Sequence, residues 1–233
     1  NFLVNAHPAL ARISAPLLTT IQGALYIRSC GVMTTLGLPA LSSVGGSALI
    51  YDNALLATAD LRTLETIGSH TDIGQNAALT DLTLTSLHSV NGNLGLYDNA
   101  FLPAIGLSSL TQVSGQIYIV NNPAVSDIDL RMLLSAPNSL YLVRNGNAQS
   151  AELILHLDAL ASVAGTFPIN ENNKLATISL PSLMAVIAGS ALPGNMSISN
   201  NPGLQSISAP SLATVADYAE FANNAALVSG DFH

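Results

Sequence analysis

Apolar residues recur along this chain in short alternating bursts that repeat about every 23 residues. Period-two alternation is typical of β-strands, which point one side chain inward and the next outward. The last three repeats are spaced by 27, 29 and 23 residues, which indicates a four-residue insertion near 145–152 and a six-residue insertion near 187–195. Such a period predicts a solenoid in which each repeat forms one coil. The ten repeats begin at Phe2, Leu25, Ala48, Thr71, Leu94, Ile117, Leu140, Phe167, Met196 and Ala219.

Within a repeat, the pattern predicts short strands joined by corners. Positions 1 and 3 and positions 12 and 14 are mostly apolar, and positions 17 and 20 add two more apolar residues. No segment keeps a helical period for ten residues, so we predict an all-β chain with little or no α-helix, forming a single repeat domain over 1–233. Small residues recur at position 22, where we expect corners with positive φ; five of them are Gly23, Gly46, Gly92, Gly115 and Gly165.

Position 6 carries asparagine in eight of the ten repeats. Each amide offers two donors and an acceptor, which can satisfy turn backbone groups that water does not reach. We therefore expect an internal ladder, which His7 begins or caps and in which Cys30 is inert packing rather than a reactive thiol. The eight asparagines are Asn53, Asn76, Asn99, Asn122, Asn145, Asn172, Asn201 and Asn224.

The pattern L-x-L-x-x-N/C-x-x-L resembles leucine-rich repeats, including the cysteine that replaces asparagine at Cys30. More closely, N-N-P-x-L at 200–204, followed by A-P-S-L-x-x-V at 209–215, is similar to the receptor L-domain family, with related segments at 121–125 and 180–186. The resemblance implies a right-handed parallel β-helix of about ten leucine-rich-repeat-like coils at a cell surface. Receptor ectodomains of this family carry flanking disulfides, whereas this chain has one cysteine. We therefore expect a microbial, extracellular or cell-surface protein.

Composition and charge exclude several function classes. Of the 233 residues, 9% are charged, and the net charge is −8, which excludes an electrostatic nucleic-acid binder. No apolar run approaches the roughly 18 residues of a membrane span. No G-x-S-x-G, P-loop, H-E-x-x-H or C-x-x-C motif is present. We therefore expect no enzyme, cofactor or metal. The histidines fall in different coils and columns, at His7, His70, His88, His156 and His233.

Five of the six tyrosines lie at the outward positions 2 and 4 of the first predicted strand. Coils stack at about 4.8 Å, so these side chains should form one exposed stripe. Tyrosine combines an apolar ring with a hydroxyl and suits contact with protein or sugar, although β-propensity alone also favours Tyr and Val in strands. We predict a non-catalytic recognition or adhesion module that binds a protein or carbohydrate ligand through this tyrosine face. It comprises Tyr26, Leu49, Tyr51, Tyr97, Tyr118, Val120, Tyr141 and Val143.

A second outward surface, at positions 11 and 13, is rich in small hydroxyl side chains. Its array resembles that of solenoid ice-binding proteins, so an ice-binding protein is an alternative function. Acidic residues interrupt the columns at Asp60, Asp81, Asp127 and Asp129; these are either solvated edge charges or ligands for Ca²⁺. Asn195-Met196-Ser197 on the second insertion is a candidate glycosylation site. The Ser/Thr face comprises Thr35, Thr58, Thr83, Thr177, Ser179, Ser206 and Ser208.

The ends of the chain suggest a further alternative. The sequence lacks an initiator methionine and a signal peptide, which indicates a mature form or a fragment. Terminal coils of a solenoid normally carry a polar or helical cap, and neither end shows a charged amphipathic helix. We therefore expect open ends that continue into neighbouring repeats or stack end to end. End-to-end stacking would make a structural, filament-forming surface protein.

Overall fold

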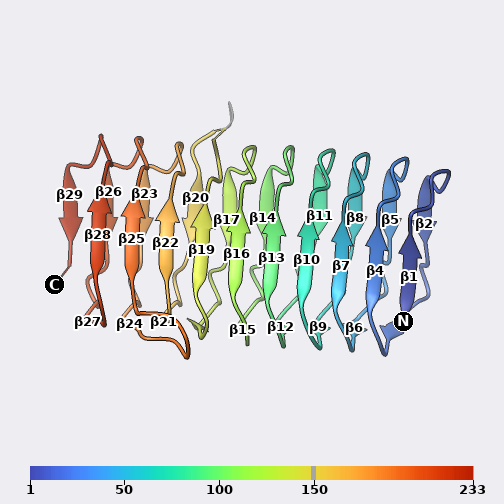
Figure 1. The fold of residues 1–233 in the computed structure, drawn as a ribbon, viewed down its shortest axis with the longest axis horizontal. Coiled ribbons are helices and arrows are strands. Elements are labelled where there is room, and N and C mark those ends of the chain that lie inside the picture. The colour runs from blue at the N-terminus through green and yellow to red at the C-terminus, as the bar shows by residue number, and fades with distance from the viewer. Residues whose placement is uncertain (148–150, 233) are drawn as a thin grey trace.

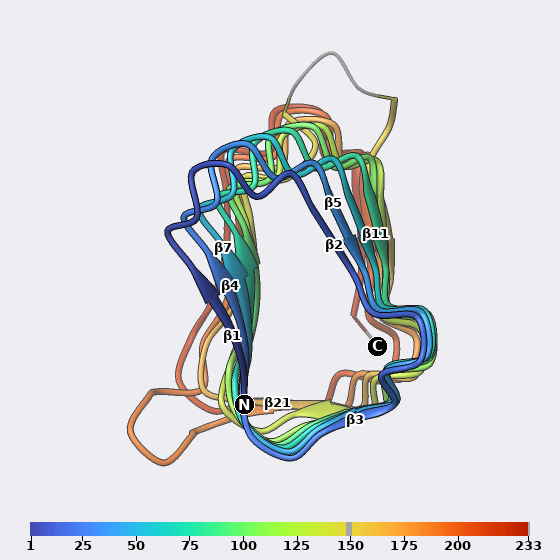
Figure 2. The ribbon, with the colours of Figure 1, turned by 90° about the vertical axis from the view of Figure 1, so that its right-hand side faces the viewer.

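The computed structural model describes residues 1–147 and 151–232, which wind into a parallel β-solenoid of ten coils (Figure 1). Seen from the N-terminal end in Figure 2, the chain runs clockwise as it recedes, so the solenoid is right-handed. No helix occurs in the described residues. The all-β solenoid predicted from the repeat period is confirmed.

The first strand of every coil joins one continuous ten-stranded sheet, which we call the first sheet (Figure 1). Leu25 pairs with Ala48 and Leu94 with Ile117, each 23 residues on, while Phe167 pairs with Met196, which confirms the size of the second insertion. In sheet order the strands are β1 (Phe2–Asn5), β4 (Leu25–Arg28), β7 (Ala48–Tyr51), β10 (Thr71–Gly74), β13 (Leu94–Tyr97), β16 (Ile117–Val120), β19 (Leu140–Val143), β22 (Phe167–Asn170), β25 (Met196–Ser199) and β28 (Ala219–Ala222).

The second side of the solenoid, to the right in Figure 2, consists of three separate sheets. The chain crosses to it through a turn that follows the first strand. The N-terminal sheet holds β2 (Arg12–Ser14), β5 (Thr35–Gly37), β8 (Thr58–Asp60) and β11 (Asp81–Thr83). The middle sheet holds β14 (Ala104–Gly106), β17 (Asp127–Asp129) and β20 (Ile154–His156), and the C-terminal sheet holds β23 (Thr177–Ser179), β26 (Ser206–Ser208) and β29 (Ser229–Asp231).

The third side, at the bottom of Figure 2, is built from the shortest strands and forms two sheets. One contains β3 (Thr20–Ile21), β6 (Ser43–Val44), β9 (Thr66–Ile67), β12 (Ser89–Val90) and β15 (Gln112–Val113). The other contains β18 (Ser135–Ala136), β21 (Ser162–Ala164), β24 (Ala185–Ile187) and β27 (Thr214–Val215).

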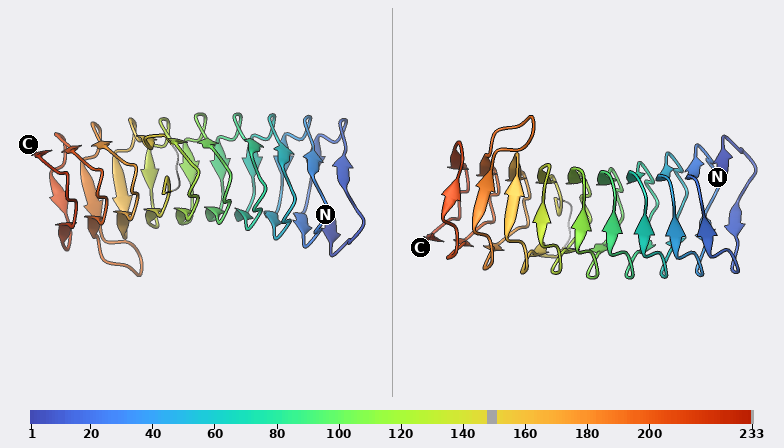
Figure 3. Two further views of the ribbon diagram at one scale, coloured as in Figure 1. Left: turned by 90° about the horizontal axis from the view of Figure 1, so that it is seen from above. Right: turned by 90° about the horizontal axis from the view of Figure 1, so that it is seen from below.

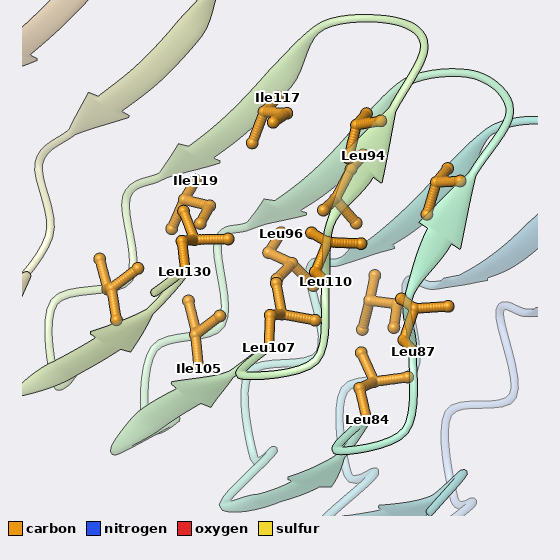
Figure 4. Close-up of a cluster of buried hydrophobic side chains, with 14 of the residues drawn as sticks. Leu84, Leu87, Leu94, Leu96, Ile105, Leu107, Leu110, Ile117, Ile119 and Leu130 are labelled. Carbon is orange, nitrogen blue, oxygen red and sulfur yellow. The ribbon is translucent and has the colours of Figure 1, made fainter. Parts of the chain in front are cut away.

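Inward-pointing leucine, isoleucine and valine side chains fill the interior from all three sides (Figure 4). Leu94 and Leu96 of β13 meet Ile105 of β14, with Leu107 and Leu110 completing the coil, and none is more than 2% exposed. Full burial of such a side chain contributes about 1.5–3 kcal/mol. In the terminal coils Phe2 and Val4 are only partly buried, and Phe221 is 40% exposed. Core burial is therefore greatest in the middle coils, where each coil has two neighbours.

The turn after each first-sheet strand has a left-handed residue at repeat position 5. All ten of these residues have φ between 52° and 59°, from Ala6 to Asn223. We expected positive φ at position 22. Of the five glycines named there, only Gly165 has a positive φ, of +92°. The expectation was wrong for Gly23, Gly46, Gly92 and Gly115. Glycine is needed at those corners because successive coils approach closely. A Cβ on Gly46 would lie 2.9 Å from the carbonyl carbon of Gly23.

The asparagine ladder lies directly behind these turns. Each amide accepts a hydrogen bond from the backbone N–H of the same position one coil earlier and donates to a first-strand carbonyl of that coil. Asn122, for example, accepts from the Asn99 N–H at 3.2 Å and donates to the Leu96 carbonyl at 3.0 Å. The chain of bonds runs from the Cys30 N–H to Asn224. His7, which we expected to begin or cap the ladder, is exposed on the first coil, and the first ladder bond is the one from the Cys30 N–H to Asn53.

The insertions interrupt this regularity at two corners. Asp127 pairs with Ile154, which confirms four extra residues between them, but residues 148–150 of that insertion lie outside the described part of the chain. The six-residue insertion at 187–195 forms a loop at the corner between the third side and the first sheet. It projects beyond the outline of the other coils in Figures 2 and 3, where it is orange.

Candidate ligand-binding face

All eight residues of the tyrosine face lie on the outer surface of the first sheet, on β4, β7, β13, β16 and β19. They span coils two to seven of the first sheet, whose strands are the ones nearest the viewer in Figure 1. Each is partly buried rather than exposed, so our expectation of a freely exposed stripe was wrong. The difference arises because the tyrosine rings pack on neighbouring strands and hydrogen-bond to one another or to adjacent side chains.

Tyr97 and Tyr118 form the central cluster of this face. Their ring centroids are 5.9 Å apart. The rings lie over Gly74 and Gly95 of the preceding strands, where an added methyl group would overlap them. The Tyr118 hydroxyl donates to the Asp72 carboxylate. Burial and the bond to Asp72 raise the pKa of Tyr118 well above its usual value, so this phenol stays neutral at physiological pH.

Tyr26, Arg28 and Tyr51 form a second cluster nearer the N-terminus. The Arg28 guanidinium lies 5.5 Å from the Tyr26 ring centroid and 5.9 Å from that of Tyr51. It donates to the Tyr51 hydroxyl at 3.0 Å, and the two hydroxyl oxygens are 2.7 Å apart. The hydrogen bonds from Tyr26 and Arg28 lower the pKa of Tyr51. Both rings are therefore held in place before any ligand arrives.

Towards the C-terminus the tyrosine face leads into a cavity of about 340 Å³. Tyr141 and Tyr218 line it together with Pro168, Asn170 and Ser197. The Tyr141 hydroxyl accepts a hydrogen bond from Thr166 at 2.9 Å. Asn170 donates to the Ser197 hydroxyl at 3.2 Å, so its amide has a fixed orientation. No carboxylate, histidine, lysine or arginine lines this cavity, although the Glu220 carboxylate accepts a hydrogen bond from the lining Ser197 hydroxyl at 3.4 Å.

A second cavity, of about 430 Å³, lies at the corner beneath the inserted loop. Gln116, Asn138 and Ser139 line it on one side, and loop residues 189–192 line it on the other. The repeat pattern gave no sign of either cavity, since the inserted loop has no counterpart in the other coils. The irregular spacing at 187–195 was the one signal that could have pointed to them.

The Ser/Thr face is not one surface in the structure. Thr35, Thr58 and Thr83 lie on the N-terminal sheet of the second side, whereas the four remaining residues lie on its C-terminal sheet. The middle sheet between them presents Ala104, Asp127, Ile154 and other non-hydroxyl residues outward. The Ser/Thr face is therefore divided into two parts. The part on the C-terminal sheet consists of Thr177, Ser179, Ser206 and Ser208.

Two of the acidic residues on the second side are engaged by arginine. Arg62 makes an ion pair with Asp60 at 2.6 Å, and Arg131 makes the equivalent pair with Asp129 at 2.7 Å. Hydrogen bonds from Arg62 hold the pKa of Asp60 below its usual range. Among residues 1–147 and 151–232, no group of three or more His, Cys, Asp or Glu side chains is placed to hold a metal ion.

The remaining candidate residues are accounted for by the fold. Cys30 is fully buried, and its backbone N–H donates to Asn53 in the ladder. His70 accepts a hydrogen bond from the Asn93 N–H at 3.0 Å, while His233 lies outside the described residues. Asn195 of the candidate glycosylation sequence is only 8% exposed, so the folded chain has no room for a glycan there.

The fold and its outer face define a parallel β-solenoid repeat protein with a partly buried aromatic surface on its continuous sheet. The chain matches no model of a known protein family, no curated protein and no solved structure. Within the part of the chain that the structure describes, there is no helix long and apolar enough to span a membrane.

Proposed function

We propose that this solenoid is a non-catalytic recognition or adhesion module of an extracellular or cell-surface protein, and that it binds a protein or glycan through the tyrosine face. The observation that carries the proposal is the clustering of five tyrosines on one side of one continuous sheet. The resemblance of the repeats to receptor L-domains supports a place at a cell surface.

The arrangement of the rings suits binding. Tyr97 and Tyr118 are packed over glycines, and Tyr26 and Tyr51 are held by Arg28, so a ligand would lose little freedom by immobilising them. Ordering a flexible side chain at an interface costs about 0.5–1.5 kcal/mol, and pre-organised rings avoid that cost. Tyrosine is also enriched among residues that dominate binding energies. The tyrosine face therefore offers aromatic area and hydroxyls at a small entropic cost.

Charge insertion tests the proposal without removing any ring. Val120 and Val143 are partly buried outward residues of β16 and β19. The double variant Val120→Glu/Val143→Glu places two carboxylates in the C-terminal part of the tyrosine face, where Val120 pairs with Tyr97. Ala104→Glu/Thr177→Glu is the matched control, because it adds the same two charges at exposed strand positions on the second side.

Binding of the three proteins is measured on an array of immobilised oligosaccharides and on intact microbial cells. The proposal predicts that the wild type and the second-side variant bind alike and that the tyrosine-face variant does not bind. Thermal unfolding establishes that all three are folded. Equal loss in both variants, or binding that survives only in the tyrosine-face variant, would show that the contact surface lies elsewhere.

A further inference from the structure

The two cavities flank the base of the same inserted loop. The corner cavity contains loop residues 189–192, and the cavity on the tyrosine face contains Asn195. Between them runs a hydrogen-bonded row in which the Thr166 hydroxyl lies 3.4 Å from Ser139 Oγ and 2.9 Å from the Tyr141 hydroxyl. The insertion thus borders both cavities, through residues 189–192 in one and Asn195 in the other.

The side chains that line these hollows carry no charge. Amides and hydroxyls supply the polar groups, and tyrosine and proline supply the apolar area. A phosphate, sulfate or carboxylate would find no countercharge among them, and the net charge of −8 opposes anions in general. One carboxylate, that of Glu220, lies beside the cavity on the tyrosine face, where it accepts a hydrogen bond from the Ser197 hydroxyl at 3.4 Å.

Neutral sugars have the complementary chemistry. Their hydroxyls donate and accept hydrogen bonds, as amide and hydroxyl side chains do. Their apolar C–H faces bury well against an aromatic ring. Asn195 borders the cavity on the tyrosine face and is more than nine-tenths buried, and its Oδ1 has no hydrogen-bond donor among the described residues. A buried acceptor without a donor costs about 1–3 kcal/mol, so hydrogen bonding is incomplete at this edge of the cavity.

Size agrees with this chemistry. Cavities of about 340 and 430 Å³ fall within the range of roughly 300–1,000 Å³ that is typical of small-ligand sites. Tyr141 lies on β19, Pro168 and Ser197 lie on the next two strands, and Tyr218 directly precedes β28, so the two tyrosines border the cavity at its two ends along the stack. A sugar unit in the cavity can lie against the ring at either end.

We propose that the ligand of the tyrosine face is a neutral saccharide, one sugar unit of which binds in the cavity between Tyr141 and Tyr218. This inference rests on the proposed function, because the cavity is the C-terminal continuation of the tyrosine face. It adds the chemical class of the ligand and places the unit that contributes most to affinity at the inserted loop.

The test uses an array that pairs neutral gluco-, manno- and galacto-oligosaccharides with uronate-containing and sialylated counterparts of equal length. Calorimetry with the strongest neutral binder then compares the wild type with Tyr218→Ala, which removes one wall of the cavity. Tyr218 is half exposed, so its loss should not disturb the core. Ser197→Gln provides a second variant, which fills the cavity and keeps both rings. Phe101→Ala is the control, because it removes an exposed aromatic ring from a turn between β13 and β14, outside the tyrosine face.

The inference predicts binding of neutral oligosaccharides, a loss of about tenfold or more in affinity for Tyr218→Ala and Ser197→Gln, and a change of less than about twofold for Phe101→Ala. If both cavity variants bind neutral oligosaccharides as tightly as the wild type does, the inference is wrong. If only acidic glycans or cells are bound, and Val120→Glu/Val143→Glu abolishes that binding, the inference fails while the proposed function stands. Binding that is insensitive to every variant of the tyrosine face overturns both.

Discussion

Replacing Asn99 by alanine should lower the free energy of unfolding by about 1.5–4.5 kcal/mol. Asn99 is fully buried in the middle of the ladder. Its Oδ1 accepts from the Asn76 N–H at 3.3 Å, and its Nδ2 donates to the Ile73 carbonyl at 3.0 Å. Alanine would leave the Asn76 N–H without a partner inside the core and would remove one hydrogen bond from the Ile73 carbonyl, which also belongs to the ladder between β10 and β13. The unmet N–H costs about 1–3 kcal/mol and the lost hydrogen bond about 0.5–1.5 kcal/mol, and the two together give the stated range.

Urea denaturation followed by circular dichroism measures this loss. Asn224→Ala is the comparison, because Asn224 makes the same two kinds of bond to Asn201 and Ile198 but is only partly buried. Water can replace the lost bonds there, so we expect a smaller loss than in Asn99→Ala. A loss below about 1 kcal/mol for Asn99→Ala, or equal losses in the two variants, would refute the role assigned to the buried amides.

Three further predictions concern the glycines and the tyrosine face. The pKa of Tyr118 is raised above the ordinary tyrosine value of 10.0, so the folded state keeps this proton longer and stability should fall as pH rises through about 10. Urea denaturation at pH 8 and pH 10.5 should therefore show a smaller loss of unfolding free energy for Tyr118→Phe than for the wild type. An equal loss in both proteins would contradict this. Gly95→Ala should displace the Tyr118 ring and lower its pKa, visible as an earlier phenolate absorbance, whereas an unchanged titration would show that the ring does not lie on Gly95. Gly46→Ala should lower the free energy of unfolding by about 1–3 kcal/mol, because the added methyl group would meet the Gly23 backbone. Gly31→Ala is the control and should change it by no more than about 0.5 kcal/mol, because a methyl group there would meet nothing within 4 Å. Similar losses in the two variants would show that close approach of the coils is not the cause.

The repeat period allowed most of the fold to be predicted, because each column of the alignment has one environment. Apolar columns became the core, and the asparagine column became the ladder, since a stack of identical corners places the same groups in the same positions. The left-handed turn position could also have been found, because Asp or Asn occupies it in five coils, at Asp52, Asp98, Asn121, Asn200 and Asn223.

The details of the surface were harder to predict, since they depend on contacts between columns. Gly74 and Gly95 lie in the outward columns, and their missing side chains let Tyr97 and Tyr118 fold onto the sheet. The repeat pattern alone predicts that all five tyrosines at these outward positions are exposed. The cavities were not predictable at all from the period, because the loop at 187–195 interrupts it and has no equivalent coil from which to infer a shape.

Hydroxyl-radical footprinting with mass spectrometry tests the central claim most directly. The protein is oxidised with and without the neutral oligosaccharide that binds best on the array, and the modification of each residue is counted. The account predicts protection of Tyr141 and Tyr218, while the exposed methionines Met132 and Met184, which lie away from the first sheet, are oxidised equally in both samples. Protection of the methionines with no change at the tyrosines would contradict the assignment of the tyrosine face as the binding surface.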